Sequence, residues 1–426
     1  MESMSWMLAI SVALLGYAYA GYPALIWLLA RLRGRPVQKG RFEGGVAVLI
    51  AAHDEAEALP AKLENLLELA ENEPIREIWI GLDGCTDGTG ARVRKTRDQR
   101  LETRDRRLET GGCGQMAEGS SLRSMVYGLQ SPPTVQILEF EPRRGKAAVL
   151  NELMAKAGQP IFLMMDARQR VEKGAVAKLL ENFADPQVGV VSGALVYESA
   201  EGGAQQGAES YWGYEKFLRR CESRYWAVPG ATGALYAIRK ELCAPIPENT
   251  LVDDVLIPMR AVLKGFRCLF EPSARVFDLP TAHFGQESLR KRRTLAGIWQ
   301  LASIEPRCFS VFANPIWLQW ISHKFLRLLT PFLVLSVLVS LGGMAWAEAG
   351  VFPALFAGAL VALGVSFLAF WGGGKRSSRL LGLLGSFWGV NRALVQAAGD
   401  AWAGRFEARW KRSGGPGPAP GPATGD

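Results

Sequence analysis

Long apolar stretches at both ends of the chain are the feature that most constrains its fold. The chain of 426 residues carries no charge over residues 6–30, and two further uncharged apolar stretches cover residues 331–346 and 351–371. A helix of about 20 apolar residues is long enough to cross a bilayer. We therefore expect transmembrane helices at both ends of the chain and a soluble domain between them.

Basic residues beside these stretches predict their orientation. One group follows the first stretch and another follows the last: Arg31, Arg33, Arg35, Lys39 and Arg41, then Lys375, Arg376 and Arg379. Because cytoplasmic flanks are rich in Lys and Arg, this pattern places the soluble domain in the cytoplasm, at the inner membrane. The first stretch continues past Ala18-Tyr19-Ala20 and no basic residue precedes it, so we interpret it as a signal anchor and not as a cleaved signal peptide.

The C-terminal region is predicted to be attached to the membrane in more than one way. Residues 317–329 have the pattern of an interfacial amphipathic helix. Residues 380–398 contain Asn391 and Arg392, so spanning and interfacial placements both stay open. The predicted organisation is a transmembrane signal anchor at 1–36, a soluble domain at 43–304, membrane-associated helices at 305–400, two or three of them beside the interfacial one, and a disordered Gly/Pro-rich tail at 413–426.

Short apolar runs that alternate with helical patterns predict an α/β fold for the soluble domain. The runs cover residues 46–50, 78–82, 135–140 and 161–165, and each ends at polar residues. This alternation is typical of a mostly parallel sheet flanked by helices. Residues 97–133 interrupt it with a charge-dense, glycine-rich stretch in which Arg-Leu-Glu-Thr occurs twice, and we interpret them as a surface insertion.

Candidate ligand-binding residues follow these runs, at the sheet edge where open α/β folds bind ligands. Asp83 ends the second run, and Gly145-Lys146 opens a helix after two arginines, as anion-binding loops do. Asp253-Asp254 precede another helix. Each feature also has a local explanation: a turn, a solvated basic loop, and helix caps favoured by the dipole. Two adjacent carboxylates equally suit a general base, because like charges raise one pKa.

Composition narrows the classes of function. The net charge of +8 suits nucleic acid, a membrane surface or a phosphorylated substrate, but the chain lacks an RNA-binding aromatic motif and its arginines lie beside apolar stretches. We therefore expect no nucleic acid partner. Six scattered cysteines and three histidines without metal-ligand spacing argue against a zinc site or a disulfide framework. No Gly-x-Gly-x-x-Gly follows the first run, so a nicotinamide-dependent enzyme is a weak alternative, and the spans are too few for an ordinary transporter.

Four ordered loops within residues 46–331 resemble the motifs of membrane-bound inverting glycosyltransferases of family 2, the group that includes cellulose-, chitin- and hyaluronan-synthase-like enzymes. The loops are Ala51-Ala52-His53-Asp54-Glu55, Leu82-Asp83-Gly84-Cys85-Thr86-Asp87-Gly88-Thr89, the helix start at Gly145, Lys146 and Asn151, and Asp253-Asp254. The first departs from the family's Pro-x-x-Asn-Glu pattern at the proline and the asparagine. The resemblance implies a GT-A-like fold.

The resemblance also implies a role for each residue. Those expected to bind the nucleotide-sugar are His53, Glu55, Asp83, Arg144, Lys146, Arg168, Arg290 and Arg293. Asp83 would accept a hydrogen bond from the base, and Lys146 would lie near the diphosphate. Asp254, next to Asp253, would be the catalytic base. The family's Gln-x-x-Arg-Trp region is matched only loosely by residues 286–293, so which arginine there approaches the pyrophosphate stays open.

The main departure from the family is Asp166-Ala167-Arg168. The family has Asp-x-Asp here, and both carboxylates serve a Mg²⁺ or Mn²⁺ ion on the diphosphate. With a cation in place of the second carboxylate, either Asp166 alone holds the ion or Arg168 neutralises the leaving group. Loss of activity is the third alternative, disfavoured because Asp83, Lys146 and Asp254 are all present.

We therefore predict a membrane-bound enzyme that moves a sugar from a nucleotide-sugar, with a uracil base implied by the resemblance, to a lipid-linked or polysaccharide acceptor at the cytoplasmic face of a lipid membrane. Cell-envelope or exopolysaccharide synthesis is the expected setting. The alternative is a non-catalytic nucleotide-sugar-binding subunit of a membrane polysaccharide synthase complex, and both hypotheses allow partner subunits. The small number of spans favours single or short additions over a processive channel, unless oligomerisation or a partner completes one.

Overall fold

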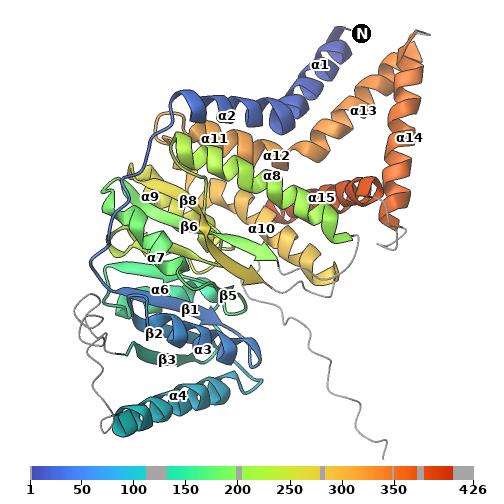
Figure 1. Ribbon diagram of the computed structural model, residues 1–426. Helices are drawn as coiled ribbons and strands as arrows, with labels where there is room; N and C mark the ends of the chain where they lie inside the picture. The colour runs from blue at the N-terminus through green and yellow to red at the C-terminus, as the bar shows by residue number, and fades with distance from the viewer. Residues whose placement is uncertain are drawn as a thin grey trace, which may run out of the picture.

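The computed structural model of the protein describes residues 2–111, 132–197, 204–278, 284–347, 350–371 and 379–405. Figure 1 shows an α/β domain with the apolar helices from both ends of the chain gathered on one side of it. Segments from the two ends of the chain therefore lie on the same side of the α/β domain.

A mixed sheet is the centre of the α/β domain. Among the described residues its strand order is β3-β2-β1-β4-β7-β6-β8-β5. The strands are β1 (Val46–Ala52), β2 (Ile75–Asp83), β3 (Thr134–Phe140), β4 (Ile161–Met164), β5 (Arg170–Val171), β6 (Val188–Tyr197), β7 (Tyr236–Arg239) and β8 (Arg267–Asp278). The first four in the order are parallel, as are β6 and β8, whereas β7 runs antiparallel to both its neighbours. The predicted α/β fold with a mostly parallel sheet is confirmed.

Burial on both faces explains why the sequences of the strands are continuous apolar runs. Every residue of β1 is buried, because helices cover both faces of this part of the sheet. The helices of the domain are α3 (Ala58–Ala70), α4 (Thr89–Gly111), α6 (Lys146–Lys156), α7 (Ala175–Leu180), α8 (Ala204–Tyr225), α9 (Asp253–Leu263) and α10 (Phe284–Ile304), with the 3-10 turns η2 (Glu181–Ala184), η3 (Lys240–Leu242) and η4 (Pro306–Phe309). On α3, Leu59, Leu63 and Leu66 have the spacing of one helix face, and all three are fully buried.

Two helix boundaries differ from the prediction. The helix α4 continues to Gly111, so the first part of the stretch interpreted as an insertion is helical, and residues 112–131 lie outside the described residues. The arginines and glutamates of that part suit an exposed helix as well as a loop, which is why its charge density misled the prediction. The helix α9 begins at Asp253, so the acidic pair lies in its first turn and not before it.

Three helices of the described chain are long and apolar enough to cross a membrane: Glu2–Leu32, Thr330–Ala347 and Phe352–Trp371. The first is made of α1 (Glu2–Gly16), the π-helical turn η1 (Tyr17–Gly21) and α2 (Tyr22–Leu32), and the others are α13 and α14. Figure 1 shows a bend at η1, after which α2 lies along the α/β domain. There Tyr22, Ile26 and Ala30 form a buried cluster with Leu218 of α8. The N-terminal helix Glu2–Leu32 is thus long and apolar enough to cross a membrane, and its second half, α2, also packs against the α/β domain.

The remaining C-terminal helices connect the apolar pair to the domain. They are α11 (Trp317–Gln319), η5 (Trp320–Phe325), α12 (Leu326–Leu328) and α15 (Arg379–Trp402). The helix α15, for which two placements stayed open, is not among the candidate spans of the described chain. Asp400 near its end receives two hydrogen bonds of 2.6 Å from Arg292 of α10, which ties α15 to the α/β domain.

Candidate active site

The carboxyl ends of β1, β2 and β4 lie side by side, as the sequence predicted. Ala52 pairs with Leu82, and Leu49 pairs with Met164, so the loops that follow these strands leave the sheet at the same edge. Because the strands are parallel, residues far apart in the sequence meet here. The loops carry Glu55, Asp83 and Asp166.

Lys146, the first residue of α6, is placed between carboxylates from two other segments. Its Nζ lies 3.0 Å from Asp166 Oδ1 and 3.2 Å from Asp253 Oδ2. Burial lowers the pKa of Lys146, but the negative charges of Asp166, Asp253 and Asp254 outweigh burial, and the net shift is upward. Lys146 is therefore firmly protonated. We call the side chains of Lys146, Asp166, Asp253 and Asp254 the active-site cluster.

Asp254 has the environment of a general base. Its Oδ2 accepts a hydrogen bond of 3.1 Å from the backbone N–H of Gly233. Burial raises the pKa of Asp254 to about 6, and the negative charges of Asp253 and Asp166 raise it as well. Lys146 and the Gly233 hydrogen bond act in the opposite direction but do not cancel this shift. A carboxylate with a pKa near 6 is still ionised at neutral pH and accepts a proton more readily than an ordinary aspartate.

Two further residues border the cluster and were missed from the sequence. A Cβ atom on Gly233 would lie 3.3 Å from Asp254 Oδ2 and 3.5 Å from Asp166 Oδ2, so the glycine leaves open the space between the two carboxylates. The Tyr236 hydroxyl is buried and has no hydrogen-bond partner within the described part of the chain. The sequence signal near these two residues is the glycine-rich turn at residues 229–234, and such a turn does not indicate which side chains lie opposite it.

Asp83 holds the loop that presents Lys146. The Asp83 side chain is fully buried and accepts hydrogen bonds from the backbone N–H groups of Arg144, at 2.6 Å, and Gly145, at 2.8 Å. Gly145 has a φ of 99°, which favours glycine over other residues. In this structure the carboxylate therefore binds the protein's own backbone, and its contact with a nucleotide base stays a prediction.

Arg168, which replaces the second carboxylate of the family motif, is paired with Glu55. The Arg168 Nε lies 2.8 and 3.0 Å from the two Glu55 carboxylate oxygens, and Nη2 lies 2.7 Å from Oε1. Two residues that the sequence assigned separately to the nucleotide-sugar thus form one bidentate pair. Neither the pairing nor its direction is visible in the sequence, because 113 residues separate the partners.

The loops after β1 and β2 also bring together His53, Asp54 and Cys85. One ligand atom from each lies within 4.8 Å of the others, a grouping that the sequence spacing of the histidines did not indicate. The His53 Nδ1 lies 2.6 Å from the Asp83 carbonyl oxygen. Sequence spacing could not show this grouping, because the parallel pairing of β1 and β2, not the sequence order, makes these residues neighbours.

The other predicted arginines lie in different places. The Arg144 guanidinium pairs with Glu152 at 3.3 Å and with Glu248 at 4.0 Å, so its backbone N–H, and not its charge, contacts the Asp83 carboxylate. The Arg293 side chain donates to the Leu251 carbonyl oxygen at 3.4 Å, close to the start of α9. The Arg290 side chain falls outside the described residues.

The active-site cluster suits a divalent cation. Three carboxylates face a single lysine, and the resulting excess of negative charge helps to raise the pKa of Asp254. Carboxylate oxygens are the ligands that Mg²⁺ and Mn²⁺ prefer. The Asp166 side chain is 27% exposed and that of Asp253 is 8% exposed, so Asp166 is the more accessible of the two carboxylates that contact Lys146. Its role as metal ligand stays a prediction.

A comparison with protein families decides the class of this site. Residues 47–245 match the family model described as Glycosyl transferase family 2. The chain carries a family 2 glycosyltransferase domain. The matched residues contain β1, except Val46, and all of β2 to β7, and with them Asp83, Lys146 and Asp166. The family predicted from the loops is thereby confirmed.

Curated relatives and a solved structure agree with this family. The chain is 22% identical over 262 residues to a poly-beta-1,6-N-acetyl-D-glucosamine synthase of Staphylococcus aureus (strain COL) and 21% identical to that of Staphylococcus epidermidis, covering 60% of this chain and 52% of each relative. It thus spans about half the length of the curated relatives it matches. The structure of the mannosyltransferase PcManGT from Pyrobaculum calidifontis, in complex with GDP-Man and Mn²⁺, superposes with a TM-score of 0.66 at 21% identity, over 94% of this chain and 99% of that one. This likeness confirms the GT-A-like fold.

Proposed function

We propose that the chain transfers a sugar from a nucleotide-sugar to an acceptor hydroxyl, with Asp254 as the general base. The observation that carries the proposal is the active-site cluster: Lys146 and Asp166, within the residues that match family 2, converge with Asp253 and Asp254, which follow them in the sequence, and the pKa of Asp254 is raised toward neutrality. A purely structural role for the acidic pair, as helix caps, does not account for Lys146 between Asp166 and Asp253.

The reaction we propose is a single inverting displacement. The acceptor oxygen forms a bond to the anomeric carbon while Asp254 takes the proton of the acceptor hydroxyl. The bond from the anomeric carbon to the diphosphate breaks on the opposite face, and the nucleoside diphosphate leaves with the electron pair. Lys146, which is firmly protonated, would stabilise the negative charge of the leaving group.

Asp166 is the residue that would hold a divalent ion. When bound, such an ion neutralises charge on the diphosphate. The pairing of Arg168 with Glu55 supports this assignment over the alternative in which Arg168 replaces the ion, because the guanidinium is already committed to a carboxylate. We propose Mg²⁺ or Mn²⁺, the ions that suit a carboxylate site.

The donor, the acceptor and the membrane side belong to the same proposal. The names of the relatives contain N-acetylglucosamine and mannose, so hexose and N-acetylhexosamine donors are the first to test. The candidate spans on both sides of the domain in the sequence support an acceptor at the membrane surface, lipid-linked or polymeric. The basic flanks support a cytoplasmic domain at the inner membrane.

The test is a donor panel with the purified full-length chain in detergent or nanodiscs. We expect hydrolysis or transfer with at least one of UDP-N-acetylglucosamine, UDP-glucose, GDP-mannose and dTDP-glucose, lost in EDTA and restored by Mg²⁺ or Mn²⁺. Turnover that persists in EDTA would contradict the metal at Asp166. A donor that binds without any turnover, in the presence of membrane lipid extracts as acceptor source, would favour the non-catalytic alternative.

A further inference from the structure

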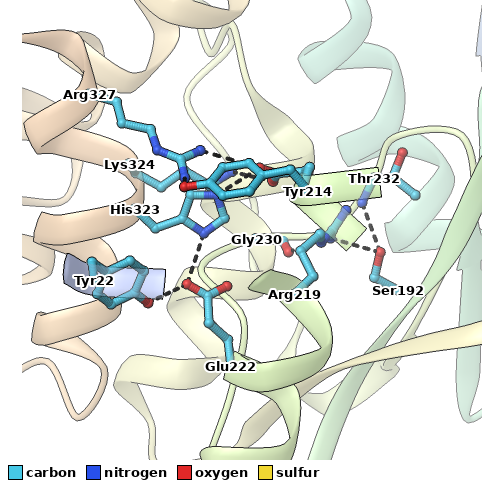
Figure 2. A network of polar contacts seen from close by, with 11 residues as sticks. Tyr22, Ser192, Tyr214, Arg219, Glu222, Gly230, Thr232, His323, Lys324 and Arg327 are labelled. Atoms are coloured by element: carbon cyan, nitrogen blue, oxygen red, sulfur yellow. Dashed lines mark hydrogen bonds and ion pairs between the residues drawn. The ribbon is translucent and has the colours of Figure 1, made fainter. Parts of the chain in front are cut away.

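One face of α8 carries three charged side chains that reach in two directions. Glu215, Arg219 and Glu222 are spaced by four and three residues, which places them on the same side of a helix. Figure 2 shows Glu222 directed to His323 and Tyr22, and Arg219 directed to Ser192 and Gly230. The helix therefore lies between the membrane-side segments and the loop beside the base.

On the membrane side, the two carboxylates hold His323 from both ends of its ring. His323 Nδ1 lies 2.8 Å from Glu222 Oε1, and Nε2 lies 2.9 Å from Glu215 Oε2. Tyr22 of α2 donates to Glu222 Oε1 at 2.5 Å, and Arg327 of α12 donates to Glu215 Oε2 at 3.4 Å. These contacts fix α8 to the N-terminal anchor and to the segment before α13. We call them the α8–His323 network.

On the catalytic side, Arg219 holds the turn that follows α8. Its Nη2 donates to the Gly230 carbonyl oxygen at 3.0 Å and to Ser192 Oγ at 3.1 Å. Ser192, which is fully buried on β6, also accepts the backbone N–H of Thr232 at 3.0 Å. Two bonds from one guanidinium therefore hold the turn at residues 230–233, directly at Gly230 and through the serine hydroxyl at Thr232.

The same turn contacts Asp254. The N–H of Ala231 donates to the Asp254 carbonyl oxygen at 2.8 Å, and the N–H of Gly233 donates to Oδ2 at 3.1 Å. Gly230 has a φ of 120° and packs against Val255 of α9, so the turn lies directly on the start of that helix. A shift of the turn would move the donor that orients the carboxylate of the base.

We propose that Arg219 is a positioning residue for glycosyl transfer: it holds the turn at residues 230–233 against Asp254 and ties the orientation of the base to the membrane-side anchoring of α8. Arg219 touches neither the carboxylates of the active-site cluster nor the sheet edge that binds the donor. Its effect is therefore expected on the chemical step and not on donor binding. The inference rests on the proposed function, since it takes Asp254 as the base.

The test compares Arg219→Gln, Arg219→Lys and Ser192→Ala with Arg220→Gln, a matched control that removes the same charge from the exposed neighbour on α8. The donor that the wild type turns over is the probe, and kcat is expressed per donor-binding site to exclude unfolded protein. We expect kcat to fall about 10- to 100-fold in Arg219→Gln, with KM and Kd for the donor within about twofold of the wild type. Arg219→Lys, which keeps the positive charge and one hydrogen-bonding nitrogen, should recover part of the loss in kcat.

Asp254→Asn in the same assay separates the two proposals. If Asp254→Asn keeps full transfer, the base assignment fails, and the proposed role of Arg219 fails with it. If Asp254→Asn is inactive while Arg219→Gln has the kcat of Arg220→Gln, the function stands and the positioning role is overturned. If Arg219→Gln does not fold, Ser192→Ala decides: a lower kcat at unchanged donor Kd supports the proposal, and wild-type kcat overturns it.

Discussion

Two groups of buried charges in this molecule are built in opposite ways. In the active-site cluster three carboxylates, Asp166, Asp253 and Asp254, face one cation, Lys146. In the α8–His323 network two carboxylates face several basic side chains, and each ring nitrogen of His323 has its own carboxylate oxygen. The first group carries an excess of negative charge, and the second is compensated from within.

This difference appears in the acidity of the carboxylates. Burial and neighbouring carboxylates raise the pKa of Asp254 to about 6. Burial would also raise the pKa of Glu215, but His323, Lys324 and Arg327 lower it well below its ordinary value. A compensated network stabilises the packing of helices, whereas an uncompensated cluster retains the capacity to take up a proton or a cation. The comparison thus separates a structural site from a reactive one within the same domain.

Removing His323 should have the largest effect on stability. His323→Leu leaves Glu215 and Glu222 buried without their shared partner, and the expected cost is about 3–5 kcal/mol in the free energy of unfolding. The midpoint of chemical denaturation in detergent measures it. The matched control is His323→Gln, whose side-chain amide can still donate to one of the two carboxylates, so its loss of stability should be smaller. A single variant as stable as the wild type would contradict a structural network.

The acidity of Asp254 should be visible in the pH dependence of transfer. The base works only when it is ionised, and its pKa is raised to about 6, so kcat/KM should be constant above about pH 7 and fall about tenfold per pH unit below 6. Initial rates across pH 4.5–8 measure the limb, with the donor Kd followed over the same range as a control. An acid limb centred near pH 4, as for an ordinary aspartate, would show that the cluster does not perturb its base.

Removing charge from the active-site cluster should stabilise the protein. A carboxyl group whose pKa is higher in the folded state than in the unfolded one loses stability as pH rises through both values, so ionised Asp254 destabilises the fold at pH 7. Asp254→Asn should raise the free energy of unfolding by about 1 kcal/mol, since the group is only partly buried. Denaturation at pH 7 and at pH 5 tests this, because the gain should shrink at the lower pH. A loss of stability would contradict an uncompensated cluster.

An exposed ion pair should have the smallest effect on stability of the charged groups compared here. Arg292 and Asp400 form a bidentate pair between α10 and α15, but the arginine side chain is 34% exposed. Asp400→Asn should cost about 0.2–1 kcal/mol and leave kcat unchanged. Thermal unfolding in low and high salt checks it, because a solvent-screened pair contributes less in salt. A larger cost would mean that α15 is held to the domain chiefly by this pair.

Local chemistry made part of this site predictable. Strands that end in polar residues, a glycine before a helix and an acidic pair at a helix start are local signals, and they led to Asp83, Lys146 and Asp254. The parallel order of β1, β2 and β4 then brings the loops together, as the alternation of strands and helices implied. The fold class followed from the same alternation.

Contacts between distant segments were not predictable in the same way. Glu215 and His323 are 108 residues apart, and Glu55 and Arg168 are 113 apart, so their pairing depends on how helices and loops pack and not on any local pattern. Tyr236 has the sequence context of an ordinary apolar strand residue, and only the three-dimensional structure shows that its hydroxyl has no partner among the described residues. No local pattern marks the charged face of α8, although it links the membrane-side segments to the turn beside Asp254.

The most direct test of the account is to measure transfer and donor binding on the same preparation of Asp254→Asn. Asparagine keeps the shape of the side chain and can still accept the Gly233 N–H, but it cannot take the acceptor proton. We expect transfer to fall by about 10²- to 10⁴-fold while the donor Kd stays within a few-fold of the wild type. Transfer that survives at near wild-type rate would contradict the central claim that Asp254 is the base of a glycosyltransferase.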